Sequence, residues 1–282
     1  MFLDHLKGKT IGILGLGYVG SNVYNYLDSI KDEYGIKIVG MDKGDLDIIK
    51  KQTFDYFINC AGNSGDFRQD IIGTIDSNIS LLLFLLQNLK VKYSFVTLSS
   101  IRLYGFSENK DICFTEEDFE VKNHLNIDFI YNGTKKLHES IICNYSSKLS
   151  YNTSIVRLSN VVGKFDVLND STLIKKIMRY KIEGILMSTN ENRNSKKDYI
   201  YIDDAVEGIL RTLTLSENNE IYNIGYGKAY SIDEIADAIN LKISYKEEKE
   251  TSLYSSISIN KAKEKIGFSP ENNIIDVLNK QV

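Results

Sequence analysis

The chain has 282 residues, of which 43% are hydrophobic and 26% are charged, with a formal net charge of -4. This composition is typical of a globular protein with room for a large core. Without a basic excess to neutralise phosphates, nucleic acid is not expected as the main partner. The three cysteines are scattered and include no CxxC pair, so the sequence predicts neither a metal site nor a disulfide framework and fits a reducing compartment.

A glycine-rich loop follows the first predicted strand. Residues 10–14 predict a buried strand, and residues 21–30 predict an amphipathic helix. Between them the sequence reads Gly15-Leu16-Gly17-Tyr18-Val19-Gly20. A strand, a GxGxxG motif and a helix in this order are typical of dinucleotide binding, because the glycines let the backbone approach a pyrophosphate at a helix N-terminus.

An acidic residue ends the second predicted strand, residues 36–41. Asp42 follows the glycine-rich loop by about 20 residues, the spacing at which a carboxylate can hydrogen-bond an adenosine ribose. A carboxylate would repel a 2′-phosphate, so this residue favours NAD as the cofactor without excluding NADP. A simpler interpretation is a tight turn plus a surface acid. It is less consistent with the order strand, GxGxxG motif, helix, second strand and acid.

Small and hydroxyl side chains end the next two predicted strands. Residues 56–59 run into Cys60-Ala61-Gly62, which would let the chain pass close to a bound cofactor. Residues 93–98 run into Ser99-Ser100. Parallel α/β folds bind ligands at the carboxyl ends of their strands, so these residues are expected near the site. Two serines that open a loop are also common turn chemistry.

The helix predicted between these two strands, residues 74–90, is apolar on nearly every face. Such a helix is either buried in the core or shared with a second subunit. Its apolar run, residues 79–86, is far shorter than a membrane span, and the N-terminal residues lack the apolar core of a signal peptide. We therefore expect a cytoplasmic protein with no membrane partner.

Tyr131 and Lys135 lie four residues apart at the start of a predicted helix, so their side chains share one face. A lysine charge about 4 Å from the phenol, at an effective dielectric of about 20, favours the phenolate by about 4 kcal/mol. That corresponds to roughly three pKa units below the usual value of about 10. The tyrosine would then act as a general acid or base near pH 7. Alone this pair is common on surface helices, and the preceding motifs give it weight.

In their order along the chain, these motifs resemble those of the extended short-chain dehydrogenase/reductases, the NAD-dependent epimerase/dehydratase family that modifies nucleotide sugars. The resemblance covers nearly the whole chain and continues through residues 155–163, 198–204, 221–225 and 267–270. It implies an α/β fold: a Rossmann-type doubly wound parallel sheet with a smaller, interleaved C-terminal substrate-binding domain.

The resemblance also implies a division into domains. An NAD(P)-binding Rossmann domain would cover residues 1–165, and a nucleotide-sugar-binding domain would cover residues 166–282, with residues 198–225 returning to the Rossmann core. In relatives, the helices equivalent to residues 74–90 and 129–147 form a four-helix bundle between subunits. A homodimer is therefore expected.

The same resemblance implies roles for single residues. Ser100 is the catalytic hydroxyl, Tyr131 is the proton donor or acceptor, and Lys135 holds the nicotinamide ribose and lowers the pKa of Tyr131. The residues expected to bind the cofactor are Gly15, Leu16, Gly17, Tyr18, Val19, Gly20, Asp42, Asp45, Leu46, Cys60, Ala61, Gly62, Asn78, Leu98, Tyr131 and Lys135. Those expected to bind the substrate are Ser100, Ile101, Arg102, Tyr131, Asn160 and Lys197. The histidines show no metal-ligand spacing, so no metal is expected, and His138 is expected to pack on its helix.

Two departures from the family pattern restrict the reaction. Dehydratases of the family carry an Asp-Glu pair directly after the catalytic hydroxyl, where this chain has Ile101 and Arg102, so dehydration is disfavoured. Leu14 stands where the family usually has the first glycine of its loop, which changes the expected contacts with the cofactor diphosphate.

Three functions follow as hypotheses. The first is an NAD(P)-dependent 4-ketoreductase of deoxysugar biosynthesis that acts on a nucleoside-diphosphate sugar. The second is a nucleotide-sugar 4-epimerase that retains NAD, since the same Ser100, Tyr131 and Lys135 serve both reactions. The third is a non-catalytic NAD(P)-binding sensor or scaffold, because a fold alone does not fix a function. The intact set of three residues argues against the third.

Overall fold

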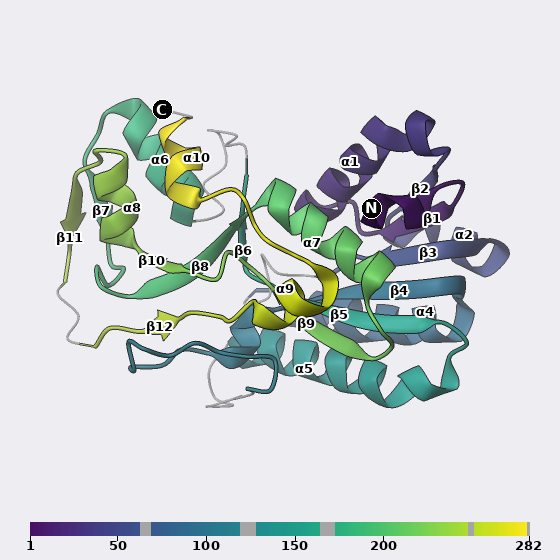
Figure 1. Cartoon of the computed structure of the whole chain (residues 1–282). Helices are drawn as coiled ribbons and strands as arrows, with labels where there is room; N and C mark the ends of the chain where they lie inside the picture. Colours follow the sequence, from purple (N-terminus) through teal and green to yellow (C-terminus); the bar gives the residue numbers. More distant parts are fainter. Residues whose placement is uncertain (63–68, 119–127, 164–172, 248–250, 281–282) are drawn as a thin grey trace.

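The larger part of the molecule is built on a six-stranded parallel sheet, seen in the computed structural model of the chain (Figure 1). The structure describes residues 1–62, 69–118, 128–163, 173–247 and 251–280. In spatial order the strands are β2 (Lys37–Met41), β1 (Thr10–Leu14), β3 (Thr53–Asn59), β4 (Lys90–Ser100), β5 (Asn152–Leu158) and β9 (Glu220–Ile224). The central strands are almost continuously apolar because helices cover both faces of the sheet.

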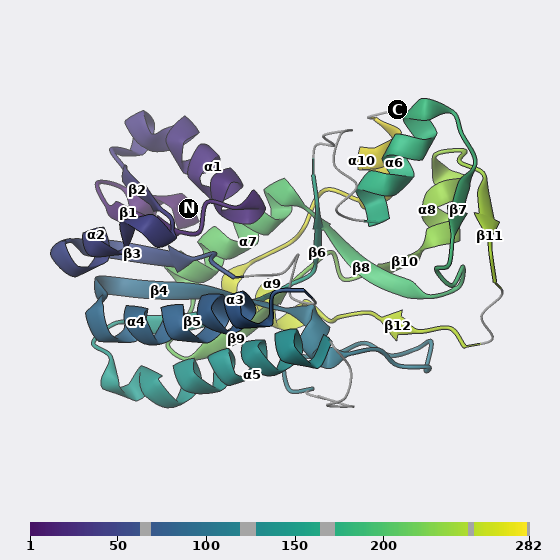
Figure 2. The same cartoon turned by 180° about the vertical axis from the view of Figure 1, so that it is seen from behind.

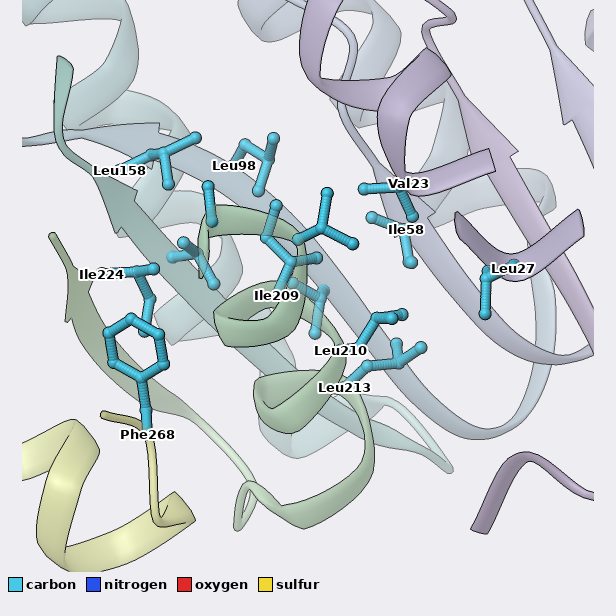
Figure 3. Packing of buried hydrophobic residues seen from close by; sticks show 14 of the residues in the cluster. Val23, Leu27, Ile58, Leu98, Leu158, Ile209, Leu210, Leu213, Ile224 and Phe268 are labelled. Carbon is cyan, nitrogen blue, oxygen red and sulfur yellow. The ribbon is translucent and has the colours of Figure 1, made fainter. Parts of the chain in front are cut away.

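Helices pack against both faces of this sheet (Figures 1 and 2). On one face lie α1 (Tyr18–Tyr34) and α7 (Ile202–Leu215), and on the other lie α2 (Leu46–Lys51), α4 (Leu81–Asn88) and α5 (Asp128–Tyr145). Figure 3 shows the core on the first face, to which Leu27 of α1, Ile58 of β3 and Ile209 of α7 contribute. Phe268, which follows α9 (Asn260–Ile266), lies next to Ile224 of β9 in the same core. Each face of the sheet thus has its own hydrophobic core.

A continuous helical stretch crosses the second face in three parts. They are α3 (Ile71–Ile75), the π-helical turn η3 (Asp76–Ser80) and α4. Among the described residues this stretch is long and apolar enough to cross a membrane by length and composition, and 33% of it is buried. Its buried residues include Leu81, Leu82 and Leu85 in the second core, which makes it a partly buried core helix.

Of the two alternatives for this helix, complete burial in the core of one chain does not hold. Ile72 is 69% exposed and Leu83 is 44% exposed. The other alternative, an apolar face shared with a second subunit, remains a prediction.

A smaller sheet lies beyond the carboxyl ends of the large one (Figure 2). Strand β8 (Lys196–Tyr201) pairs with β10 (Ala229–Ser231), β12 (Tyr254–Ser255) and β6 (Asn160–Val162), the first antiparallel and the others parallel. A separate parallel pair joins β7 (Met187–Thr189) to β11 (Ile243–Tyr245). Three helices complete this part around a third hydrophobic cluster: α6 (Leu173–Glu183), α8 (Ile232–Ala238) and α10 (Ile274–Asn279). The remaining short helices are η1 (Phe2–Leu6), η2 (Lys43–Asp45), η4 (Ile101–Tyr104) and η5 (Ser146–Lys148).

The doubly wound parallel sheet with a smaller second sheet confirms the predicted fold class. Strand β8 belongs to the smaller sheet, whereas α7 and β9, which follow it in the chain, belong to the larger part. The predicted domain boundary at residue 165 lies outside the described residues, so the division at that point stays a prediction.

Candidate active site

The predicted glycine-rich loop joins β1 to α1 and touches the end of β3. Gly15 has a φ of +90°, and a Cβ at this position would lie 2.5 Å from the Ala61 backbone nitrogen. A Cβ on Gly20 would overlap the Gly15 carbonyl oxygen. At Gly17, the N-cap of α1, a Cβ would have no neighbour within 4 Å among the described residues. Two glycines therefore allow close packing, and the third leaves the N-terminus of α1 open.

A cavity of about 370 Å³ opens beside this loop, at the carboxyl ends of the first strands. It is lined by Leu14, Gly15, Gly17, Asp42, Lys43, Cys60, Ala61, Gly62 and Ser77. Sequence reasoning did not assign Leu14, Lys43 and Ser77 to the cofactor site. Each of the three adjoins a predicted residue, Gly15, Asp42 or Asn78, and this adjacency is a signal that could have found them. Ser77 lies in the π-helical turn, which no sequence pattern marks.

The residues around the cavity fit a dinucleotide. The open N-terminus of α1 presents backbone N–H groups that favour a phosphate. The Asp42 carboxylate lies at the end of β2, where Oδ1 accepts a hydrogen bond from the Leu16 backbone N–H (2.9 Å). This bond ties the glycine-rich loop to the next strand and places the carboxylate on the cavity wall.

Four other predicted cofactor residues have structural roles at this end. The Asp45 carboxylate accepts a hydrogen bond from the Asp42 backbone N–H (2.9 Å) and so caps η2. Leu46 packs against the second core and Val19 against the first. The Tyr18 hydroxyl occupies the space that a Cβ on Gly163 would need, and burial raises the pKa of this phenol to about 12.

Ser100 and Tyr131 are brought together by β4 and α5. Ser100 is the last residue of β4 and the N-cap of η4, where its Oγ accepts a hydrogen bond from the Arg102 backbone N–H (3.2 Å). Tyr131 is buried and forms a side-chain hydrogen bond with Ser100. The Arg102 guanidinium carbon lies 5.8 Å from the centroid of the Tyr131 ring. A hydroxyl, a phenol and a cation thus meet at one strand end.

The pKa of Tyr131 differs from the sequence-based expectation. Burial raises the pKa of the phenol above its ordinary value, whereas the Arg102 charge and the Ser100 hydrogen bond oppose this rise. The cation that acts on the phenol is Arg102, and the expected strong lowering by Lys135 is wrong for this arrangement. The spacing of four residues put both side chains on one face, but it did not set their separation or the cost of burying a phenolate.

Lys135 lies under the cavity instead. Its Nζ donates a hydrogen bond to the Leu98 carbonyl oxygen (2.9 Å) and lies 3.1 Å from the point that a Cβ on Gly62 would occupy. Burial lowers the pKa of Lys135 to about 8, and the neighbouring Glu139 opposes this shift. The ammonium is therefore placed to contact a ligand in the cavity. Leu98, a predicted cofactor residue, holds this ammonium through its backbone carbonyl oxygen.

Asn78 lies next to Gly62 of the cavity wall and contacts Thr134 and His138, which sequence reasoning did not assign to the site. The Asn78 Nδ2 donates a hydrogen bond to Thr134 Oγ1 (3.0 Å), and its Oδ1 lies 3.1 Å from the same Cβ point on Gly62. The backbone carbonyl oxygen of Asn78 lies 2.7 Å from Nδ1 of His138, which is 1% exposed. The expected packing of His138 on its helix is thus only part of its environment. A possible signal was its position three residues after Lys135, on the same helix face.

The residues expected to bind the substrate do not lie together in one place. Ile101 is buried in a small hydrophobic cluster with Tyr104 and Phe114. Asn160 and Lys197 lie on the paired strands β6 and β8, where Asn160 Nδ2 donates to the Asp198 carbonyl oxygen (2.8 Å). The structure therefore groups Arg102 with Tyr131, places Asn160 and Lys197 on the smaller sheet, and places the side chain of Ile101 in a core.

Comparisons with known proteins agree with this arrangement. Residues 11–225 match the model of the NAD dependent epimerase/dehydratase family. The chain belongs to this family. Similar curated proteins include dTDP-4-dehydro-6-deoxyglucose reductase of Escherichia coli, 25% identical over 63% of this chain and 54% of the relative. Another is a putative UDP-glucose 4-epimerase of Methanocaldococcus jannaschii, 29% identical over 50% of this chain and 48% of the relative. These matches span about half of the relatives' length.

Two solved structures share the fold of this chain. RMD from Pseudomonas aeruginosa, complexed with NADPH, superposes with a TM-score of 0.79 at 22% identity over 96% of both chains. The UDP-glucose 4-epimerase of Thermotoga maritima, with UDP-glucose, gives 0.79 at 19% identity over 96% of both chains. At such identities the likeness establishes the α/β fold of this family member.

Acid should destabilise the wild-type protein more than a His138→Asn variant. Burial, with a contribution from the Lys135 charge, lowers the pKa of His138 to about 3, whereas an unfolded histidine has a pKa of about 6.5. The unfolded state therefore binds the proton first, and the contribution of His138 to stability is complete above pH 6.5 and is lost as the pH falls toward 3. Between pH 6.5 and 5 this loss reaches about 2 kcal/mol. Denaturant unfolding at pH 7, 6 and 5 measures it, and parallel pH profiles for both proteins would contradict a neutral buried imidazole.

Proposed function

We propose that this family member is an NAD(P)-dependent oxidoreductase that acts on a nucleoside-diphosphate sugar, as a 4-ketoreductase of deoxysugar biosynthesis. The observation that carries the proposal is the hydrogen bond between the buried Tyr131 and Ser100, the last residue of β4. The Lys135 ammonium is held by Leu98 of the same strand and lies beside Gly62 of the cavity wall. A hydroxyl, a phenol and an ammonium in this place are the groups that a carbonyl reduction needs.

The cavity would hold the cofactor through residues whose geometry is suitable. Gly17 and the N-terminus of α1 would take the diphosphate, Asp42 the adenosine ribose, and Lys135 with Asn78 a ribose hydroxyl near Gly62. The reduced nicotinamide, when bound, supplies the hydride. The carboxylate of Asp42 favours NAD, and Lys43 beside it on the cavity wall would tolerate an added phosphate.

Tyr131 would donate the proton and Ser100 would orient the sugar oxygen. Because burial raises the pKa of Tyr131, the phenol is protonated at pH 7, which is the form that reduction of a ketone requires. Ser100 is already hydrogen-bonded to the phenol and would hold the carbonyl oxygen beside it. The Arg102 charge at the ring would stabilise negative charge that develops on the phenol oxygen.

Substrate recognition would involve the smaller sheet. The Lys197 side chain is 29% exposed, and its Nζ lies 3.6 Å from a Glu191 carboxylate oxygen. A diphosphate at the β8 surface would compete with this carboxylate for the lysine charge. Ile101 and Arg102 replace the acidic pair of the dehydratases, and Ile101 is buried. This arrangement supports reduction over dehydration.

A 4-epimerase is the second candidate. The chain is similar to a putative UDP-glucose 4-epimerase, and Ser100, Tyr131 and Lys135 would serve the oxidation and re-reduction of one sugar carbon equally well. Epimerisation begins with Tyr131 as a base, so the raised pKa of the phenol favours the reductase.

Purified protein should oxidise NADH or NADPH when a 4-keto nucleotide sugar is added. A reductase must exchange its cofactor in each turnover, so absorbance at 340 nm should fall in proportion to the sugar consumed. The control is the corresponding 4-hydroxy nucleotide sugar, which should cause no consumption. Interconversion of two sugars without added reductant, by protein that carries tightly bound NAD, would assign the epimerase instead.

Replacement of Tyr131 by Phe should lower kcat by about 10²- to 10⁴-fold, because the proton donor is lost. Binding of NADH should be retained, since the cofactor contacts assigned above lie mainly in the cavity. A suitable control is Tyr151→Phe: Tyr151 is a buried phenol whose hydroxyl has no hydrogen-bond partner among the described residues. Steady-state kinetics and titration with NADH measure both effects. Unchanged turnover in Tyr131→Phe would contradict a catalytic role for Tyr131. If the wild-type protein binds the cofactor but turns over no substrate, a non-catalytic NAD(P)-binding sensor would be favoured.

The protein is proposed to work as a cytoplasmic homodimer. Exposed apolar side chains, including Ile72 and Leu83 on the α3–α4 stretch and Leu137 on α5, form the surface that a partner would cover. Light scattering should give twice the chain mass of 32.1 kDa. Leu83→Asp should give a monomer, and Ile182→Asp on α6, at a similarly exposed position, should leave the dimer intact. A wild-type monomer would contradict the proposal.

A further inference from the structure

His138 is a buried imidazole whose two nitrogens bind two different elements. Its Nδ1 lies 2.7 Å from the Asn78 carbonyl oxygen in the π-helical turn, and its Nε2 lies 2.8 Å from Thr97 Oγ1 on β4. The ring itself belongs to α5, three residues after Lys135. One side chain therefore connects α5, β4 and the turn η3 beneath the cavity.

The partners fix the direction of these hydrogen bonds. A carbonyl oxygen only accepts, so Nδ1 carries the proton and Nε2 accepts from the Thr97 hydroxyl. Thr97 Oγ1 in turn accepts from Asn59 Nδ2 (3.2 Å), and Asn59 Oδ1 accepts from the Ala61 backbone N–H (3.1 Å). The chain of bonds begins at Ala61, which lines the cavity, and ends at Asn78.

The end of this chain faces the Lys135 ammonium. Asn78 Oδ1 is buried and accepts no hydrogen bond from the part of the chain that the structure describes. This oxygen and Lys135 Nζ each lie 3.1 Å from one point, the position of a Cβ on Gly62. The Asn78 amide oxygen and the Lys135 ammonium thus lie on either side of a space next to Gly62 of the cavity wall. Any side chain at position 62 would fill this space. Such a pair suits a hydroxyl group, which can donate to the amide oxygen and accept from the ammonium.

The turn that carries Asn78 needs this support because its backbone is irregular. A π-helical turn inserts an extra residue into a helix and is usually short. Here it separates α3 from α4, and Asn78 at its centre is fully buried. Without a donor at position 138, the Asn78 carbonyl would lose a buried hydrogen bond and the turn would be free to rearrange.

We propose that His138 is a positioning residue: by holding the Asn78 carbonyl, it aims the Asn78 amide oxygen at the space above Gly62 that Lys135 also faces, for a hydroxyl of the bound dinucleotide. This role rests on the proposed function, since it requires a dinucleotide in the cavity. His138 acts through Asn78 and has no contact with the reacting atoms.

Three variants test the role. His138→Leu removes both hydrogen bonds, and His138→Asn keeps a short donor that reaches toward the Asn78 carbonyl. Ile142→Ala is the matched control, because Ile142 is also 1% exposed and lies one turn further along α5, in the second core. It shows what a loss of packing on this helix does by itself.

Binding of NADH, measured by fluorescence titration, is the first readout. We expect the Kd to rise at least tenfold in His138→Leu, to stay within about threefold of wild type in His138→Asn, and to stay unchanged in Ile142→Ala. Amide hydrogen exchange is the second readout, and it needs no ligand: exchange in residues 76–82 should increase in His138→Leu but not in Ile142→Ala. Thermal melts identify any variant that is unfolded. If His138→Leu is unfolded, His138→Asn is compared with Ile142→Ala in its place.

The outcomes separate this role from the proposed function. Equal Kd values and equal exchange in His138→Leu and Ile142→Ala would overturn the positioning role and leave a histidine that only packs. Normal NADH binding without reduction of any 4-keto sugar would overturn the ketoreductase, and the Kd comparison would still decide the role of His138. Failure of the wild-type protein to bind NADH or NADPH would overturn both.

Discussion

The hydrogen bond from Lys135 Nζ to the Leu98 carbonyl oxygen, 2.9 Å long, is the constraint on which the site depends. A buried ammonium is costly unless it is paired, and here burial lowers its pKa to about 8. The charge is held where α5, the end of β4 and Gly62 after β3 come together. This contact holds α5 against the carboxyl-terminal part of β4, and it leaves the ammonium beside Gly62 of the cavity wall.

A second buried interaction sets the register of the same helix. Glu139, one turn after Lys135, pairs with Arg157 of β5 at 2.8 Å, and Arg157 also donates to the Tyr104 hydroxyl at 2.9 Å. Tyr104 then donates to Asn223 of β9 at 2.6 Å. A buried ion pair adds little stability compared with an apolar core, but a misplaced one is costly, so it discriminates against a shifted helix. Because Tyr104 ends the short helix that Ser100 caps, the network also holds the hydroxyl of Ser100, the proposed catalytic residue.

The sequence predicted the elements that obey simple periodicities and the glycines that close packing requires. The strand at residues 10–14, the acid at Asp42 and the small residues after β3 are where the patterns put them, because each follows from local geometry. The π-helical turn could not be predicted, since an apolar helix has the same pattern with or without an inserted residue. The link between His138 and Asn78 was also out of reach, because it joins residues 60 apart in the chain.

Electrostatic effects were the hardest to predict because they depend on burial and on the direction of each side chain. The spacing of Tyr131 and Lys135 indicated a strongly acidic phenol, but the ammonium turns toward Leu98 and the phenol toward Ser100. Several motif residues also proved to be structural: the buried Asp198 carboxylate accepts hydrogen bonds from Ser159 and from the backbone of Tyr226 and Gly227, and so holds β8 to the loop after β9. A motif therefore indicates which residues matter, and burial decides whether a group moves protons or holds the chain.

The protonation of Tyr131 links this structure to the direction of the reaction. In the proposed reduction, the buried phenol, which keeps its proton at neutral pH, would donate it, and the Arg102 charge would stabilise the phenolate that results. The same arrangement would slow a reaction that begins with proton abstraction, because the base would first have to ionise in a buried site. Arg102 occupies one of the two positions where dehydratases of the family carry acids. An acid there would add negative charge beside the phenol and disfavour the phenolate that proton donation leaves. In the proposed reductase, the exchange of acid for arginine would therefore both remove the groups for elimination and assist proton donation.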